Sequence, residues 1–204
     1  EKLPQGFDGF RIAHISDFHS AAVMTDAVID KLESANPDII CITGDLISSG
    51  DKTVETALKL AEKAARIAPC YFITGNHENM VSKELFTALL EGVKDNGVIL
   101  LADEQVILGK GDAQIALVGH FWGDTYAVGE ISDFDGYRVL LSHHPEAIND
   151  YASAGYELVL TGHAHGGQFR LPFVGGLYAP GQGFLPEYDA GVVSQECTDM
   201  VVSR

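Results

Sequence analysis

The sequence has few of the features that mark membrane spans, disulfide frameworks or nucleic-acid binding. It has no apolar run of about 18 residues or more, so no segment within it is long enough to span a membrane as a helix. Its three cysteines, Cys41, Cys70 and Cys197, show no CxxC spacing, which argues against a disulfide framework, a zinc knuckle or a catalytic thiol. Basic residues number 13 against 29 acidic ones, and a net charge of -16 repels polyanions. Nucleic acid is therefore not an expected partner.

The rest of the composition is that of an ordinary globular protein. Hydrophobic residues make up 46% and charged residues 21% of the 204 positions, and no repeat or long linker divides the chain. Residues 1–204 are therefore predicted to form a single domain. Because the sequence begins with Glu1 rather than Met, a signal peptide or anchor preceding it stays open.

The first half alternates short β-branched runs with amphipathic segments. We predict strands over 11–16, 39–43 and 71–74 and helices over 26–34, 53–68 and 83–91. This β-α-β-α-β order predicts parallel strands joined by right-handed crossovers.

The second half is less regular. Strands near 99–101, 105–108 and 114–118 suggest a hairpin and meander, and they are followed by strands over 138–142 and 157–161 around a helix over 146–153. The Gly- and Pro-rich stretch 166–191 predicts loops with short strands, and 199–203 resembles a last strand.

Five polar clusters follow the predicted parallel strands where each strand ends. They read Asp17-Phe18-His19, Gly44-Asp45, Gly75-Asn76-His77-Glu78, Ser142-His143-His144-Pro145 and Gly162-His163-Ala164-His165-Gly166-Gly167. Ligands of open α/β sheets bind outside the carboxyl ends of the strands, so these clusters are expected to converge on one rim.

The residue types in these clusters suit a transition metal. Asp17 and His19 are two positions apart, as are His163 and His165, so in extended backbone each pair points to one side. Imidazole and carboxylate ligands suit zinc, iron and manganese, whereas calcium prefers oxygen ligands alone.

The five clusters, in this order from Asp17 to Gly167, resemble the calcineurin-like metallophosphoesterase family. The GHAHGGQ segment after SHHPE is similar to a bacterial branch whose members are often membrane-anchored or exported. The resemblance implies an α/β fold in which a β-sandwich of two mixed sheets is flanked by helices. It also implies phosphodiester hydrolysis by attack of a metal-bridging hydroxide on phosphorus, with two divalent ions of manganese, iron or zinc as cofactors.

The resemblance also assigns a role to each matching position. One metal would be bound by Asp17, His19 and His165, the second by Asn76, His143 and His163, and both by Asp45. His77 would contact the phosphate and protonate the leaving oxygen. The family more often has Asp where Glu78 stands, so whether Glu78 orients His77 is an open question at this point.

Several alternatives stay open from the sequence. His144 competes with His143 as the ligand, and His14 fits a core or strand-edge position. His120 is a candidate for lining the pocket. The stretch 121–136, in a region that often shapes the pocket in this family, is short. A phosphomonoesterase, a hydrolase of other substrates and a non-catalytic scaffold that binds a protein partner are the alternative functions.

The expected substrate is a small phosphoester, with lipid-linked compounds and nucleotides both open. Cytoplasmic, membrane-associated and exported locations also stay open. Relatives usually continue through another turn and strand, so the single metallophosphoesterase domain over 1–204 can lack an N-terminal anchor and a C-terminal strand.

Overall fold

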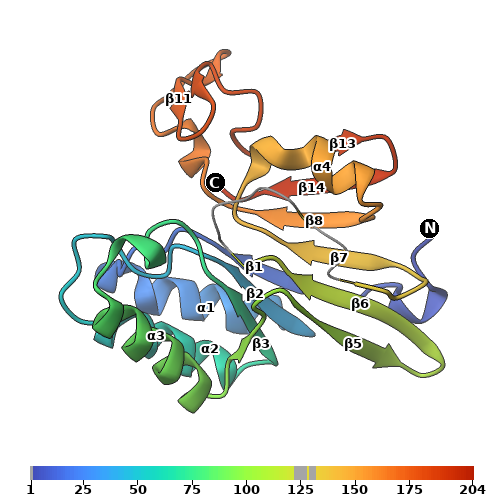
Figure 1. Ribbon diagram of the computed structural model, residues 1–204, viewed down its shortest axis with the longest axis horizontal. Coiled ribbons are helices and arrows are strands. Elements are labelled where there is room, and N and C mark those ends of the chain that lie inside the picture. The colour runs from blue at the N-terminus through green and yellow to red at the C-terminus, as the bar shows by residue number, and fades with distance from the viewer. Residues whose placement is uncertain (1, 122–127, 129–131) are drawn as a thin grey trace.

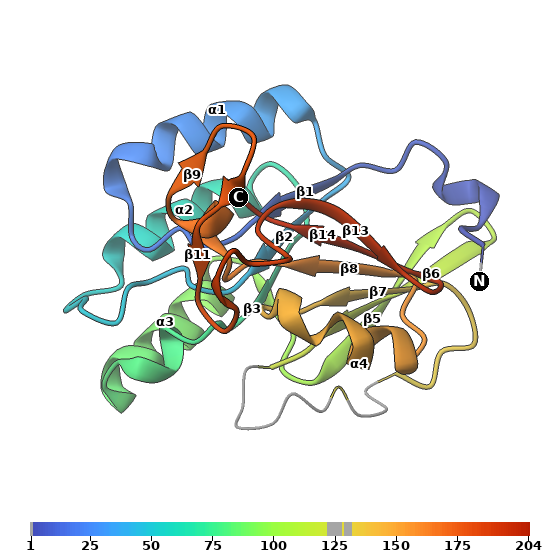
Figure 2. The same ribbon diagram turned by 90° about the horizontal axis from the view of Figure 1, so that it is seen from above.

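Two β-sheets pack face to face, with helices covering both outer faces (Figures 1 and 2). This computed structural model describes residues 2–121, 128 and 132–204. The bounds of the α-helices are α1 Thr25–Ala35, α2 Glu55–Ala65, α3 Lys83–Asp95 and α4 Ile148–Ser153. Short 3-10 turns are η1 Gln5–Phe7, η2 Ala22–Met24, η3 Glu78–Met80, η4 Pro145–Ala147 and η5 His165–Gly167.

The first sheet has the order β1-β2-β3-β4, and its described strands are parallel. They are β1 Ile12–Ile15, β2 Ile39–Thr43, β3 Cys70–Ile73 and β4 Ile99–Leu100. Helices α1, α2 and α3 connect these strands and cover one face of the sheet (Figure 1).

The second sheet has the order β13-β14-β8-β7-β6-β5 and mixes parallel with antiparallel pairs. Its strands are β5 Glu104–Lys110, β6 Ala113–Gly119, β7 Arg138–Leu141, β8 Leu158–Thr161, β13 Gly191–Gln195 and β14 Thr198–Val202. Helix α4 packs on its outer face, where Tyr151 and Tyr156 are buried. Two small hairpins, β9 Arg170–Leu171 with β10 Gly175–Gly176 and β11 Tyr178–Ala179 with β12 Gly183–Phe184, stand apart from both sheets.

The two-residue period of the strands explains why the layers hold together. In β2, Ile40 and Ile42 face the helices, whereas Ile39 and Cys41 face the second sheet. Because both faces of β2 are buried, its sequence is an unbroken apolar run instead of an alternating one.

The α/β sandwich of two sheets flanked by helices confirms the expected fold class. The predicted helices and long strands are present, with ends shifted by a few residues. One strand belongs elsewhere than expected: β4 does not start a meander but extends the first sheet beside β3. The sequence did not predict β13. Most of the stretch 121–136 that we expected to shape the pocket lies outside the described residues. In the part of the chain that is described, no helix has the length and apolarity needed to cross a bilayer.

Candidate metal centre

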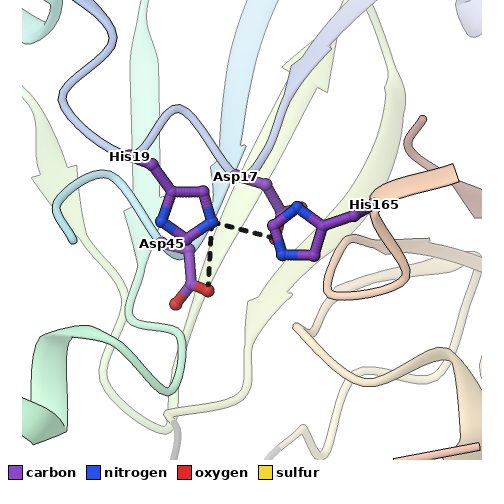
Figure 3. Close-up of side chains that lie close together, drawn as sticks. All are labelled: Asp17, His19, Asp45 and His165. Carbon is purple, nitrogen blue, oxygen red and sulfur yellow. Dashed lines mark ion pairs between the residues drawn. The ribbon is translucent and has the colours of Figure 1, made fainter. Parts of the chain in front are cut away.

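The five polar clusters meet at one end of the molecule, where the carboxyl ends of β1, β2, β3, β7 and β8 lie together (Figures 1 and 3). The rim is formed by two sheets, not by one sheet as the strand order alone suggested. The His163 backbone N–H donates a hydrogen bond to the Asp17 carboxylate, and this bond joins the loop after β8 to the loop after β1.

Asp45 is the centre of the site. Its side chain is fully buried, and its Oδ2 lies 3.4 Å from His143 Nε2, 3.7 Å from His19 Nε2 and 3.9 Å from His77 Nε2. The other oxygen, Oδ1, accepts the His77 backbone N–H at 2.8 Å. One carboxylate oxygen is thus surrounded by three imidazoles that come from three loops.

A first group of possible ligands surrounds Asp17 (Figure 3). Asp17 Oδ1 lies 3.5 Å from His165 Nε2 and 3.9 Å from His19 Nε2, and the rings of His19 and His165 stack with centroids 5.0 Å apart. Together with Asp45, these residues place four ligand atoms within 4.8 Å of one another.

A second group shares Asp45 with the first. The ligand atoms of Asp45, His143 and His163 also lie within 4.8 Å of one another. Asn76 belongs beside them, because its Oδ1 lies 3.1 Å from His143 Nε2. His143 Nδ1 donates to the Thr43 carbonyl at 2.7 Å, which turns Nε2 toward Asp45. The seven residues singled out in the sequence therefore lie together, in two groups with one shared carboxylate.

Five of these seven residues have left-handed backbone. The φ angles are 54° for Asp17, 48° for His19, 52° for Asp45, 65° for His163 and 48° for His165. Such angles are uncommon outside glycine and are enriched at functional sites, where the surrounding structure holds them. The extended backbone expected for the pairs Asp17/His19 and His163/His165 is therefore wrong, because both pairs lie in sharp turns. Asp17 and His19 belong to one group of ligand atoms, whereas His163 and His165 belong to different groups.

The donor atoms fit divalent metal ions. Both ring nitrogens of His19 and Oδ2 of Asp45 are buried and have no hydrogen-bond partner among the described residues. Buried polar atoms without partners are costly and rare in native proteins, and a bound cation would satisfy Asp45 Oδ2 together with Nε2 of His19, which lies 3.7 Å from it. Nitrogen and carboxylate donors together suit zinc, iron or manganese.

Burial and neighbouring groups shift the pKa values of three residues in the site. Burial opposes ionisation of Asp45, yet His143 and the His77 N–H outweigh it and lower the pKa of this carboxyl to about 2. Burial likewise opposes charge on His143, but Asp45 raises its pKa to about 9. Burial, and then the imidazoles of His143 and His144, lower the pKa of His163 to about 4. His163 is therefore neutral near pH 7, which is the form that binds metal.

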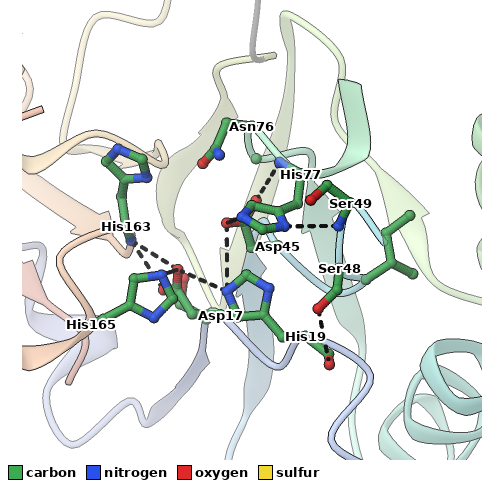
Figure 4. Close-up of polar contacts among 12 residues, drawn as sticks. Asp17, His19, Asp45, Ser48, Ser49, Asn76, His77, His163 and His165 are labelled. Atoms are coloured by element: carbon green, nitrogen blue, oxygen red, sulfur yellow. Dashed lines mark hydrogen bonds and ion pairs between the residues drawn. The ribbon is translucent and has the colours of Figure 1, made fainter. Parts of the chain in front are cut away.

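His77 faces the same centre from the loop after β3 (Figure 4). Its Nδ1 accepts the Ser49 backbone N–H at 2.9 Å, so neutral His77 carries its proton on Nε2, the atom turned toward Asp45. A group with this geometry can donate a hydrogen bond from Nε2 into the site.

Glu78 holds the backbone around Asp45 instead of holding His77. Its carboxylate is fully buried and accepts the N–H groups of Gly75, Asp45, Leu46 and Ile47 at 2.7 to 3.2 Å. Burial, and then the nearby Asp45, raise its pKa to about 6 although the N–H groups favour the charged form. The longer side chain has a role in positioning the loop that carries Asp45.

The remaining histidines lie around the site. His144 is buried beside His163, with ring centroids 4.9 Å apart, and its Nδ1 contacts Glu146 at 2.7 Å. The geometry thus favours His143 over His144 as the residue facing Asp45. His14 Nε2 bonds Thr43 Oγ1 at 2.8 Å, as a strand histidine would, and His120 Nδ1 contacts Asp103 at 3.3 Å.

Some members of this environment had no signal in the sequence. Glu146 forms a possible ligand group with His144 and His163, and the backbone groups of Ser49 and Thr43 orient His77 and His143. Main-chain donors and acceptors occur at every position, so only the fold could reveal which ones are used.

The part of the chain that contains this site matches the model of a known protein family. The calcineurin-like phosphoesterase family model matches residues 10–167, which include all five clusters. The chain belongs to the calcineurin-like phosphoesterase family. As a member of it, the chain is a metallophosphoesterase, a hydrolase of phosphoric esters.

Two relatives of this calcineurin-like phosphoesterase come from bacteria. It is 31% identical to the metallophosphoesterase YkuE of Bacillus subtilis over 99% of the chain and 73% of that protein. It is 27% identical to the phosphodiesterase YaeI of Escherichia coli over 84% of the chain and 66% of that protein. The chain thus spans about two thirds to three quarters of these relatives.

A solved structure shares the fold. The phosphopantetheinyl hydrolase PptH of Mycobacterium tuberculosis superposes with a TM-score of 0.59 over 94% of this chain and 88% of its own, at 10% identity. At that identity the likeness shows the common fold alone.

Proposed function

We propose that this chain is a phosphodiesterase that uses two divalent metal ions bridged by Asp45. The observation that carries the proposal is the position of Asp45 Oδ2 among the imidazoles of His143, His19 and His77. A single buried carboxylate shared by two ligand groups is the geometry that a dinuclear site requires.

Asp17, His19 and His165 would hold one ion, and Asn76, His143 and His163 the other. When bound, two such ions supply Lewis acidity toward the phosphoryl oxygens and toward the attacking water. Our assignment of the ions to zinc, iron or manganese rests on the mixture of imidazole and carboxylate donors.

His77 would act on the leaving group. Because the Ser49 N–H occupies Nδ1, the N–H of neutral His77 is on Nε2, where it can donate a hydrogen bond toward the phosphoester. A hydrogen bond from Nε2–H to the phosphoryl or leaving oxygen would stabilise the negative charge that develops as the phosphorus–oxygen bond breaks.

A diester is preferred over a monoester as substrate because the relative YaeI is named a phosphodiesterase. The acidic chain also favours a substrate with one negative charge over a more highly charged monoester. A non-catalytic scaffold is disfavoured, since all seven ligand positions carry a residue that can bind metal.

The test joins metal analysis to a matched pair of substrates. The protein loaded with Mn²⁺, Zn²⁺ or Fe²⁺ is assayed on bis-p-nitrophenyl phosphate and on p-nitrophenyl phosphate, which share a leaving group. We expect about two metal ions per chain and a kcat/KM at least tenfold higher for the diester. The Asp45→Asn variant, purified in parallel, controls for contaminating phosphatases and should lose both activity and metal. Two bound metals with no hydrolysis of either ester would refute the proposal.

A further inference from the structure

Exposed apolar side chains are concentrated in one segment after His165. Seven of the fourteen large apolar side chains that are exposed among the described residues lie within residues 169–185, the stretch that contains both small hairpins. Phe173 is fully exposed, and Phe184 and Phe169 are 86% and 73% exposed. Exposed apolar groups scattered singly are normal, but a cluster of this kind marks a surface that binds something.

This segment, which we call the apolar hairpins, is attached directly to the candidate metal centre. It begins four residues after His165, and the Leu177 N–H returns to the Gly167 carbonyl at 3.2 Å. Arg170 Nη1 donates to the Gly166 carbonyl at 2.7 Å. Figures 1 and 2 show the hairpins at the end of the molecule where the strands that carry the site terminate.

The loops across the site add to this surface. Val23, in the turn after His19, is 91% exposed, and Met80, in the turn after His77, is 62% exposed. The rim of the site therefore carries exposed apolar groups on the loops after β1 and β3 as well as after β8.

The charge of the apolar hairpins differs from that of the whole chain. Residues 166–186 contain one charged residue, Arg170, and its Nη1 pairs with Asp189 at 2.8 Å. The rest of the chain is strongly acidic, with a net charge of -16 overall. A surface without net charge fits a zwitterionic layer, whereas an anionic layer would repel the acidic body behind it.

The shape of the apolar hairpins favours a fluid layer over a folded protein as the occupant. Phe173 and Leu185 stand at bends with φ angles of 69° and 54°, which are unfavourable for bulky residues. Phe173 lies in the turn between β9 and β10, whereas Leu185 follows β12 at the base of the other hairpin, so the two side chains do not extend from one continuous strand face. Lipid chains can adapt around protruding rings, and aromatic residues prefer the boundary of a bilayer.

We propose that the apolar hairpins insert into the surface of a zwitterionic lipid layer and place the metal centre against phosphodiesters carried by lipids. This inference rests on the proposed function for its chemistry, because water would add to phosphorus and the ester oxygen would leave. The docking itself depends only on the surface and can be measured without catalysis.

The experiment compares two double variants of the metal-loaded protein. Phe173→Ser with Phe184→Ser removes the two most exposed rings of the hairpins. Ile107→Ser with Val192→Ser removes two exposed apolar side chains, in β5 and β13, that lie outside the loops of the site. Flotation with phosphatidylcholine vesicles measures binding. Rates are measured on bis-p-nitrophenyl phosphate in solution and on the p-nitrophenyl phosphodiester of dioleoylglycerol carried in the same vesicles.

We expect the original protein and the Ile107/Val192 variant to bind vesicles alike. The Phe173/Phe184 variant should bind roughly 100-fold more weakly, since each inserted ring is worth about tenfold or more. Its ratio of vesicle to solution rate should fall at least tenfold, whereas that of the control variant should not.

The inference is overturned if the original protein does not float with vesicles, or if both double variants lose binding equally. It is also overturned if the hairpins are covered by a second copy, seen as a dimer that the Phe173/Phe184 substitutions dissociate. Vesicle binding by a protein inactive on both esters would sink the proposed function and leave the docking surface standing.

Discussion

His77 is oriented by a main-chain group, and this sets what its removal should do. The Ser49 N–H fixes the ring from outside the ligand groups, and no metal in the proposed centre depends on His77. We therefore expect His77→Ala, which removes this hydrogen-bond donor, to lower kcat by about 10²–10³ while about two metals per chain remain. Steady-state kinetics with metal analysis of the same sample would check this. Loss of a metal ion would show that His77 is a ligand instead.

His143 makes metal binding dependent on pH. In the metal-free protein Asp45 raises the pKa of His143 to about 9, so below that pH a proton occupies the nitrogen that the metal needs. His163, with a pKa of about 4, is already deprotonated above pH 5. Binding at the second group should thus release one proton, and its affinity should rise about tenfold per pH unit between pH 6 and 8. Titration against a competing chelator at constant ionic strength measures this slope, and a flat profile would contradict the assignment.

At the residue scale, most of the site could be predicted because its ligands are chemically distinctive. Asp, Asn and His directly after strands stand out in the sequence, and Asp17, His19 and Asp45 all lie where expected. That they bind metals stays a prediction. The role of Glu78 could not be predicted, because its partners are four backbone N–H groups from loops that come together only in the folded protein.

At the scale of single elements, the end of β3 leaves no room beside Asp45. A Cβ on Gly75 would lie 2.3 Å from Asp45 Oδ1 and 2.9 Å from the His143 ring. Gly75→Ala should therefore displace the bridging carboxylate, lowering metal affinity at least tenfold and stability by about 1–3 kcal/mol.

Gly109 in β5 provides the matched control, because a Cβ there meets no atom within 4 Å. Gly109→Ala should keep full metal affinity and change stability by less than about 1 kcal/mol. Isothermal titration and denaturant unfolding of both variants would check the contrast. Equal metal affinity in the two would show that the Gly75 loop relaxes.

The elements differed in how well their sequences predicted them. Strand β2 has an apolar run buried on both faces, and α2 has regular helical spacing, so both were predicted. The strand β4 has only two residues, too few for a period, and its partner β3 lies across a helix in the sequence. The strands of the two hairpins also have only two residues each, too few for a period to show in the sequence. Strand β13 is mostly exposed, so its sequence lacks the apolar pattern of a buried strand.

At the scale of the whole molecule, the proposed ions would connect the two sheets. The first sheet supplies Asp17, His19, Asp45 and Asn76, and the second supplies His143, His163 and His165. Metal that binds only the folded state stabilises it by about 4 kcal/mol when present at a thousandfold excess over Kd. For a chain of this size that corresponds to a rise of roughly 10 °C in Tm.

Calorimetry before and after chelation would measure this stabilisation. We expect chelator to lower the Tm of the original protein by about that amount. Asp45→Asn, which lacks the shared ligand, should show little response. An unchanged Tm of the original protein on chelation would mean that the ions do not connect the sheets.

The division of the ligands between two sheets also has a consequence during synthesis of the chain. The ribosome releases the N-terminal sheet first, with Asp17, Asp45 and Asn76 in place, but His163 and His165 emerge almost ninety residues later. Until then Ile39, Cys41 and Tyr71, which the second sheet will cover, remain open to chaperones and to aggregation. A nascent chain therefore cannot acquire a complete centre early, and metal capture is tied to the last step of folding.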